Sequence, residues 1–256
     1  AALMLIGMTT TILSPEPSPQ NSHRTTEWNA KSRTERLASW FKKAAVMPFL
    51  DFIRRYRFQA IALLAMISLY RISDIVMGVM SNPFYIDMGF SLTEIGAVVK
   101  VVALCASVIG IIFGGVIVKR IGIYNGLMIG AFLVMLTNLC FSYVAITDKN
   151  ITSLSIIVGM DSLAAGIVGT VNIAFLTSLV SKRYTGFQYA LLTGFMAGPG
   201  FALKGLSGVW VEYLQQIYGF SYGWMSFYIS TSLLALPAIL FLYFNRHFLI
   251  NHEKSI

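Results

Sequence analysis

Residues 152–180 read TSLSIIVGMDSLAAGIVGTVNIAFLTSLV, an apolar stretch interrupted by one ionisable side chain, that of Asp161. A helix rises about 1.5 Å per residue, so this stretch is long enough to cross a hydrocarbon core of about 30 Å. The chain holds comparable apolar segments at 58–81, 91–118, 123–146, 188–213 and 223–245. Lipid offers no partners to backbone polar groups, and alternating β-type patterning is absent. The sequence therefore predicts an all-α integral membrane protein with a six-helix transmembrane bundle over 58–245.

The composition supports a membrane protein and gives no support to an enzyme. Apolar residues make up 56% of the chain and charged residues only 12%, about half the charged share of a soluble domain. The two cysteines, Cys105 and Cys140, lie inside apolar runs, where neither a disulfide framework nor a zinc site is expected. No nucleophile–base set, phosphate-binding loop or cluster of metal ligands stands out in the sequence. We therefore expect no catalytic residues, no metal and no cofactor.

The regions outside the bundle divide into three parts. Residues 1–13 are apolar but too few to span a bilayer, so we expect the end of a truncated transmembrane helix. Residues 14–57 form an inter-domain linker that begins rich in Ser, Thr and Pro and ends as a basic segment with helical apolar spacing. This segment is expected to be either a helix on an anionic membrane face or a partly ordered connector. Residues 246–256 form a tail.

The basic residues are distributed very unevenly between the two sides of the predicted bundle. Of the 19 Lys and Arg residues, fifteen fall on the side of the linker, Lys149 alone falls on the other side, and three lie inside apolar segments. Positive residues accumulate on the cytoplasmic side of membrane proteins, so the linker and the C-terminal tail are predicted to be cytoplasmic. The formal net charge of +8 is thus a topology signal, and no nucleic-acid partner is expected.

Five ionisable residues interrupt the apolar segments: Arg71, Asp74, Lys100, Asp161 and Lys204. Ionisable groups in the hydrocarbon cost roughly 2.5–3.5 kcal/mol each, which makes each one a candidate functional residue. At about 1.5 Å per residue, all five lie about 10–15 Å from the outer ends of their segments. This shared depth predicts a water-filled cavity near the midplane, where secondary transporters bind substrate. Three cations and two anions favour an anionic small-molecule substrate.

Alternatives remain open for these charges. Arg71 and Asp74 are spaced three residues apart and can pair, so they could simply neutralise each other and lock two helices. Asp161 has no basic neighbour on its own segment. A carboxyl group withdrawn from water can take up a proton near neutral pH, which makes Asp161 a candidate for proton coupling. The alternative is an ion pair between Asp161 and either Lys100 or Lys204.

Two glycine-containing stretches add to these candidates. Gly198, Pro199 and Gly200 lie beside Lys204, and because proline removes a backbone hydrogen bond, a kinked gating helix is expected there. Kinks are, however, common in membrane bundles. Gly110 and Gly114 form a small-xxx-small pair typical of close helix packing, and Asn138 and Gln188 are expected to bond between helices.

Several motifs resemble one family of transporters. Gly114, Gly115, Lys119, Arg120 and Gly122, in a short turn after an apolar segment, resemble the cytoplasmic loop signature of the major facilitator superfamily. A longer ordered series, between about residues 58 and 245, is similar to the AmpG-type anhydromuropeptide permeases of that superfamily. It includes Tyr70-Arg71-Ile72-Ser73-Asp74, Glu94-Ile95-Gly96 with Lys100, Ile146-Thr147-Asp148-Lys149, Ala174-Phe175-Leu176-Thr177-Ser178-Leu179, Gln188-Tyr189-Ala190-Leu191-Leu192, Gly223-Trp224, Phe227-Tyr228 and Leu236-Pro237-Ala238.

The resemblance implies a function and a missing partner. It implies proton-driven import of anhydro-sugar muropeptides across a bacterial inner membrane for peptidoglycan recycling. The six segments would be helices seven to twelve, and the N-terminal six-helix half would be absent. Arg71, Asp74, Lys100 and Asp161 match charged positions of the family pattern, whereas Lys204 matches none. The alternatives are a carrier of another anionic solute and a membrane fragment or scaffold that transports nothing.

Overall fold

A computed structural model of the chain describes residues 9–10, 13, 34, 39–42 and 46–254. The chain divides into two units, residues 1–43 and 44–256, and the second unit holds the helical bundle. The truncated helix expected at 1–13 and most of the linker expected at 14–57 lie outside the described residues. Every helix discussed below belongs to the second unit.

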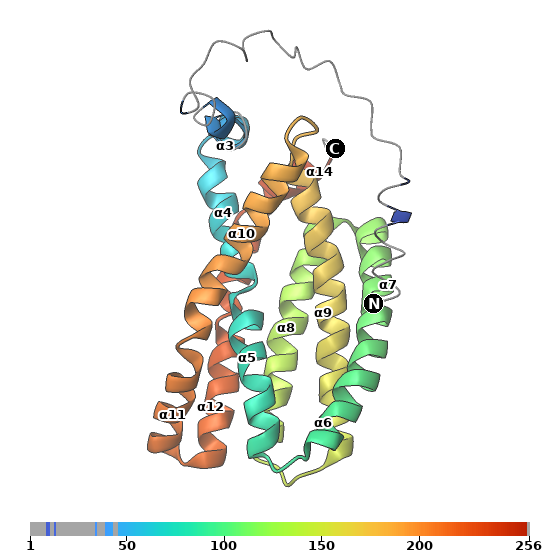
Figure 1. Cartoon of the computed structure of the whole chain (residues 1–256), viewed down its shortest axis with the longest axis vertical. Coiled ribbons are helices and arrows are strands. Elements are labelled where there is room, and N and C mark those ends of the chain that lie inside the picture. The colour runs from blue at the N-terminus through green and yellow to red at the C-terminus, as the bar shows by residue number, and fades with distance from the viewer. Residues whose placement is uncertain (1–8, 11–12, 14–33, 35–38, 43–45, 255–256) are drawn as a thin grey trace. The chain divides into compact units, whose positions relative to one another are not determined.

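Helices follow one another with short connections, and the described residues contain no β-strand (Figure 1). Their bounds are α3 Met47–Tyr56, α4 Gln59–Tyr70, α5 Ile72–Asp87, α6 Leu92–Ala97, η3 Val98–Ala103, α7 Leu104–Ile121, α8 Ile123–Val144, α9 Ile151–Leu179, α10 Thr185–Lys204, α11 Ser207–Tyr218, α12 Phe220–Leu233, α13 Leu236–Phe244 and α14 Arg246–Lys254. The turns that carry Lys119 and Arg120, and Lys182 and Arg183, lie at the same end of the bundle as α3 and α14 (Figure 1). We call this end the α3 end.

Within the described residues, five helices are long and apolar enough to cross a membrane. They are Gln59–Asp87, Leu92–Ile121, Ile123–Val144, Ile151–Leu179 and Phe220–Phe244. The segment predicted over 188–213 is not among these five, and the structure divides it between α10 and α11 at Gly205 and Leu206. Lys204 and the glycines that follow it interrupt the apolar run at this point, and glycine in a helix interior costs roughly 1 kcal/mol relative to alanine.

Close helix packing explains the glycine pair in α7. A Cβ atom added at Gly110 would collide with the backbone carbonyl of Leu163, and one added at Gly114 would lie 2.8 Å from Cβ of Thr170. Both contacts are with α9, so the expected small-residue interface is confirmed. Small residues let two backbones approach in lipid, where the hydrophobic effect does not drive helices together.

Aromatic rings fill the core at the end of the bundle away from α3. Phe84, Phe141, Trp224, Phe227 and Tyr228 are all at most 2% exposed, and Phe141 stacks on Tyr228 with ring centroids 5.2 Å apart. The indole Nε1 of Trp224 donates to Asp87 at 3.0 Å, which fastens the start of α12 to the end of α5. This arrangement holds α5, α8 and α12 together at the end of the bundle away from α3, beyond the charged residues described next.

Candidate functional site

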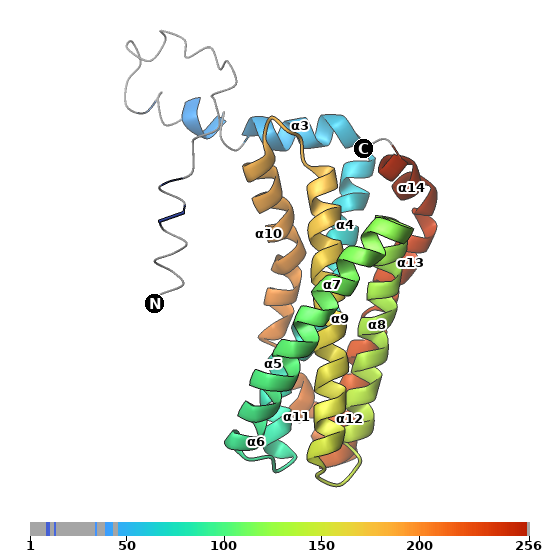
Figure 2. The ribbon, with the colours of Figure 1, turned by 90° about the vertical axis from the view of Figure 1, so that its right-hand side faces the viewer.

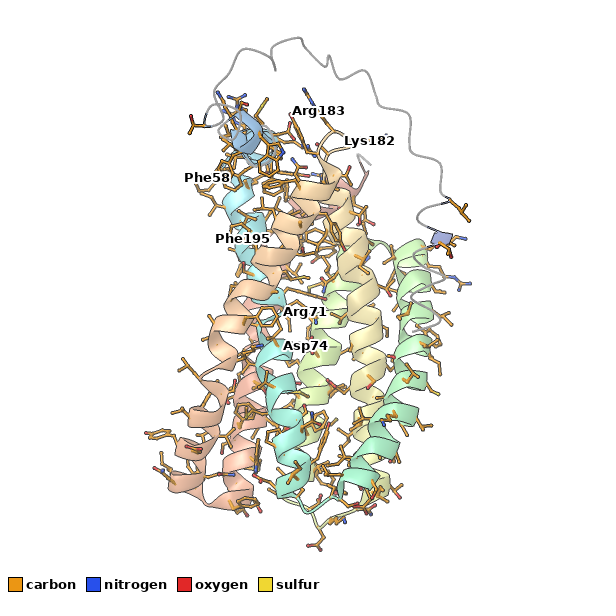
Figure 3. The ribbon with its side chains drawn as sticks, viewed as in Figure 1. Phe58, Arg71, Asp74, Lys182, Arg183 and Phe195 are labelled. Atoms are coloured by element: carbon orange, nitrogen blue, oxygen red, sulfur yellow. The ribbon has the colours of Figure 1, made fainter. Side chains whose placement is uncertain are left out.

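Arg71 lies at a break between two helices. α4 ends at Tyr70 and α5 begins at Ile72, with Arg71 at φ −103° and ψ −3° between them. The buried hydroxyl of Tyr70 donates to the Leu127 carbonyl of α8 at 2.9 Å, which fixes the end of α4. Asp74 lies in the first turn of α5, where a carboxylate is favoured by the helix dipole. Figure 3 shows Arg71 and Asp74 about half-way along the bundle.

The expected ion pair is present. An Arg71 guanidinium nitrogen lies 2.8 Å from an Asp74 carboxylate oxygen, and the two side chains are 27% and 23% exposed. The pair is therefore only partly buried, half-way along the bundle (Figure 3).

A buried chain of polar side chains runs beside this pair. Asn138 of α8 donates to the Ser73 hydroxyl at 2.9 Å, and that hydroxyl donates to the Thr231 carbonyl of α12 at 2.6 Å. Ser73, Asn138 and Thr231 are at most 1% exposed. The expected interhelical role of Asn138 is confirmed, while Ser73 and Thr231 were not singled out from the sequence. Only the position of Ser73 between Arg71 and Asp74 pointed to it.

Asp161 of α9 approaches the same region. It is half-buried, and its carboxylate is near enough to that of Asp74 for the two negative charges to repel each other. The alternative that Asp161 pairs with Lys100 or Lys204 is not seen, because the ion pairs of the described residues are Arg55–Asp51, Arg71–Asp74 and Lys149–Glu94. The structure therefore brings together Arg71, Asp74 and Asp161.

Lys100 lies apart from these three, on an open groove. It belongs to η3, a π-helical turn where the sequence predicted regular helix, and it is exposed. The groove has a volume of about 490 Å³ and is lined by Val99, Lys100, Ala103, Leu104, Ser107, Ser162 and Ala165. Ser162 and Ala165 belong to α9, so the groove lies between η3–α7 and α9, next to Asp161 in the chain. π-Helical turns widen a helix locally and occur frequently at functional sites.

Lys204 is the last residue of α10, and its ammonium lies over the Phe201 ring at 4.3 Å from the centroid. The structure does not place it with the Arg71 cluster. A cation in the last turn of a helix is favoured by the helix dipole, which gives Lys204 a local structural role. The five charged residues were predicted to share one cavity, but they lie in three places. Arg71, Asp74 and Asp161 form a cluster, Lys100 lies on a groove, and Lys204 lies by itself.

The Gly198-Pro199-Gly200 stretch remains inside α10 rather than ending it. Pro199 has no N–H and leaves the carbonyl four residues earlier, that of Phe195, without its helical partner. The Ser68 hydroxyl of α4 donates to this carbonyl at 3.0 Å, as interrupted helices in lipid require. Gly200 allows close contact with α5, since an added Cβ would lie 2.6 Å from Cδ1 of Ile75, whereas Gly198 faces open space. The broken helix α4–α5 and the proline-containing helix α10 therefore contact each other.

The 114–122 motif contains packing residues and exposed cations. Gly114 packs against α9, Gly115 faces open space, and Lys119 and Arg120 are exposed. Gly122 has φ +90°, a conformation that favours glycine.

Gly122 also lies against the carboxylate of Glu253 from α14. That carboxylate accepts hydrogen bonds from the backbone N–H groups of Ile123 at 2.7 Å and Tyr124 at 3.3 Å. This contact was not predicted, because its two partners are about 130 residues apart in the sequence.

Comparison with known proteins connects this arrangement to a family. The chain is 30% identical over 211 residues to the AmpG 4 protein of Rickettsia felis, covering 82% of this chain and 48% of that protein. It is 27% identical over 243 residues to the anhydromuropeptide permease of Escherichia coli strain K12, covering 94% of this chain and 45% of the permease.

The chain thus spans about half the length of the curated relatives that it matches. The pattern of the Major Facilitator Superfamily matches residues 1–204, more than three-quarters of the sequence. A transmembrane helical bundle with charged residues half-way along it agrees with this match. The chain belongs to the Major Facilitator Superfamily.

Proposed function

We propose that this chain provides the C-terminal half of a secondary transporter that imports anionic muropeptides, the anhydro-sugar fragments of bacterial cell wall, into the cytoplasm. The observation that carries the proposal is the partly accessible Arg71–Asp74 pair at a helix break in the middle of the bundle. An arginine can bind a substrate carboxylate in a two-bond geometry. The permease name of the Escherichia coli relative, which is similar over 94% of this chain, supports muropeptides as the substrate class.

We further propose that protons drive the import and that Asp161 carries the proton. When all three groups are ionised, Arg71, Asp74 and Asp161 have a net charge of −1, and one proton makes the cluster neutral. Because a net charge inside a membrane bundle is costly, uptake of that proton would favour a rearrangement of the cluster. Lys100, exposed on the groove that Ser162 and Ala165 of α9 also line, would add the attraction for an anion that the cluster of three lacks.

The topology belongs to the same proposal. Residues 1–13 would end helix six, residues 14–57 would link two halves, residues 58–245 would form helices seven to twelve, and residues 246–256 would form a cytoplasmic tail. The α3 end would face the cytoplasm of a bacterial inner membrane, because it carries the exposed Lys119, Arg120, Lys182 and Arg183. A six-helix N-terminal half would be the partner, because transporter sites form between two repeats.

Uptake of labelled anhydromuropeptide tests this proposal. The chain is co-expressed with the N-terminal half of the Escherichia coli permease in cells that lack their own permease, with and without an uncoupler. We expect accumulation that the uncoupler abolishes and that Arg71→Gln and Asp161→Asn each reduce more than tenfold. Glu212→Gln is the matched control, because Glu212 is exposed on α11, away from the cluster.

Three outcomes would contradict parts of the proposal. Accumulation that the uncoupler does not affect would refute proton coupling. Uptake of other anions but not of muropeptides would identify a carrier of another solute. Absence of any uptake, with both halves present in the membrane, would favour a scaffold.

A further inference from the structure

α3 is fastened across the end of the bundle. Figure 2 shows it lying crosswise to α4, α9 and α10. The fully buried Gln188 of α10 donates to the Pro48 carbonyl at 2.9 Å and to the Asp51 carboxylate at 3.0 Å. Arg55 pairs with Asp51 at 2.7 Å and also donates to the Leu179 carbonyl at the end of α9. Phe52 and Tyr56 are buried in the core, so one face of α3 packs against the bundle.

The chain turns sharply where α3 meets α4. Arg57, between the two helices, has φ +49°, a region in which a non-glycine residue is strained by about 1–3 kcal/mol. Its N–H donates to the Ile53 carbonyl at 2.6 Å, which closes α3. Such a conformation persists where the surrounding contacts enforce it. The crosswise direction of α3 is therefore a fixed feature of the fold.

The other face of α3 and the neighbouring loop present cations that have no carboxylate partner among the described residues. Arg54, Arg57, Lys182 and Arg183 are all exposed, and we call them the basic face. Figure 3 shows Lys182 and Arg183 at the α3 end. Among the described residues, the acidic side chains at this end are Asp51 and Glu253, and both are engaged in the contacts given above. Arg183 additionally lies over the Tyr184 ring. The basic face is thus open to anions from outside the described part of the chain.

Large apolar side chains lie next to these cations. Phe58 and Ile61 are 86% and 69% exposed, and they lie where the spanning helix Gln59–Asp87 begins. Phe58 directly follows Arg57, so an exposed ring and an exposed guanidinium belong to adjacent residues just before this spanning helix. This combination suits a molecule with an anionic phosphate at one end and acyl chains at the other.

We propose that the basic face and Phe58 form a binding site for anionic phospholipid. The phosphate binds Arg54, Arg57, Lys182 and Arg183, while the acyl chains lie against Phe58 and Ile61. The site holds α3 at the membrane surface and ties it, through the lipid, to the loop between α9 and α10. This proposal is independent of which solute the chain carries.

Lipid retention measured by native mass spectrometry tests the site. The whole chain is placed in nanodiscs made of equal amounts of phosphatidylglycerol and phosphatidylcholine with identical acyl chains, and the ratio of the two lipids retained on the protein is measured. Two double variants each neutralise two of the four cations of the basic face. They are Arg54→Gln with Arg57→Gln, and Lys182→Gln with Arg183→Gln. The control, Lys119→Gln with Arg120→Gln, removes the same charge at the same end of the bundle.

We expect wild type and the control to retain phosphatidylglycerol preferentially. Each double variant should lose this preference, by about fivefold for each cation removed. Arg54→Lys with Arg57→Lys keeps the charge and should keep the preference, which separates loss of binding from loss of folding. Equal losses in the control, or no preference in wild type, would overturn the site. Loss of retained phosphatidylglycerol on adding excess inorganic phosphate would mean that free phosphate is the ligand, which would overturn a lipid site.

Discussion

The contact of Glu253 with the start of α8 makes a quantitative prediction about stability. The Glu253 carboxylate accepts two backbone N–H groups that have no partner within α8, at 2.7 and 3.3 Å. Loss of a helix N-cap costs about 0.5–2 kcal/mol, and a negative charge at a helix N-terminus contributes about 0.3–1 kcal/mol. Because Glu253 is half-buried and one of the bonds is long, we expect Glu253→Ala to lower the free energy of unfolding by about 2 kcal/mol.

Thermal unfolding of the purified chain in detergent measures this effect. A chain of this size loses roughly 2–4 °C of melting temperature per kcal/mol, so Glu253→Ala should melt about 4–8 °C lower. Glu253→Gln keeps one acceptor oxygen but no charge and should lose about half as much. Glu212→Gln, at an exposed position of α11, should change the melting temperature little, because surface substitutions cost up to about 0.5 kcal/mol.

A double-mutant cycle with Gly122 tests the geometry itself. A Cβ at residue 122 would collide with the Glu253 carboxylate, so Gly122→Ala should displace that side chain as well as strain a backbone at φ +90°. Once Glu253 is alanine, only the backbone strain remains, and Gly122→Ala should cost less. Strict additivity of the two substitutions, or a melting temperature of Glu253→Ala equal to that of Glu212→Gln, would refute this reasoning.

Three other predictions concern single contacts. Ser68→Ala should destabilise the chain by about 1 kcal/mol, because it leaves the Phe195 carbonyl without a donor. This cost should shrink in a Pro199→Ala background, where residue 199 regains its N–H. Equal costs in both backgrounds would argue against the role of Ser68 as the replacement donor. Gly110→Val should prevent α7 from packing on α9, whereas Gly115 faces open space. The yield of folded protein, measured by size-exclusion chromatography, should therefore fall far more for Gly110→Val than for Gly115→Val. Burial raises the pKa of Asp51, but hydrogen bonds from Gln188 and Arg55 outweigh it, so the pKa lies below its ordinary value of 3.8. The folded state is therefore stabilised above that value and loses the stabilisation as pH falls through the lower folded pKa, and Asp51→Asn should remove this acid dependence from melting curves.

The sequence was informative wherever one local property decides the outcome. Apolar length placed the spanning segments within a few residues of Ile151–Leu179 and Ile123–Val144, because the hydrocarbon thickness sets the length that is needed. The three-residue spacing of Arg71 and Asp74 was enough to predict their ion pair. In each case the partners or the constraint lie within one turn of helix or within one segment.

The sequence was uninformative where the partner is distant along the chain. Ser73 pairs with Asn138 and Thr231 across three helices, and nothing in the apolar pattern identifies those partners. The prediction that all five charges share one cavity failed for a similar reason. Similar depth along separate helices does not determine the direction in which a side chain points. Lys204 lies at a predicted depth close to that of Arg71 and yet contacts Phe201.

The contact between α4–α5 and α10 connects these features into one physical argument. One of these helices is broken at Arg71, and the hydrogen-bond pattern of the other is interrupted by Pro199. In lipid, a backbone group released by an interruption must find a partner on a neighbouring helix, and Ser68 supplies that partner for Phe195. An interruption in one helix is therefore tolerated because a specific neighbour lies beside it, and the close approach at Gly200 brings that neighbour near enough. Since a side-chain bond is more easily exchanged than the regular bonds of an unbroken helix, this pair of helices is where we expect the bundle to change shape in the transport proposed above.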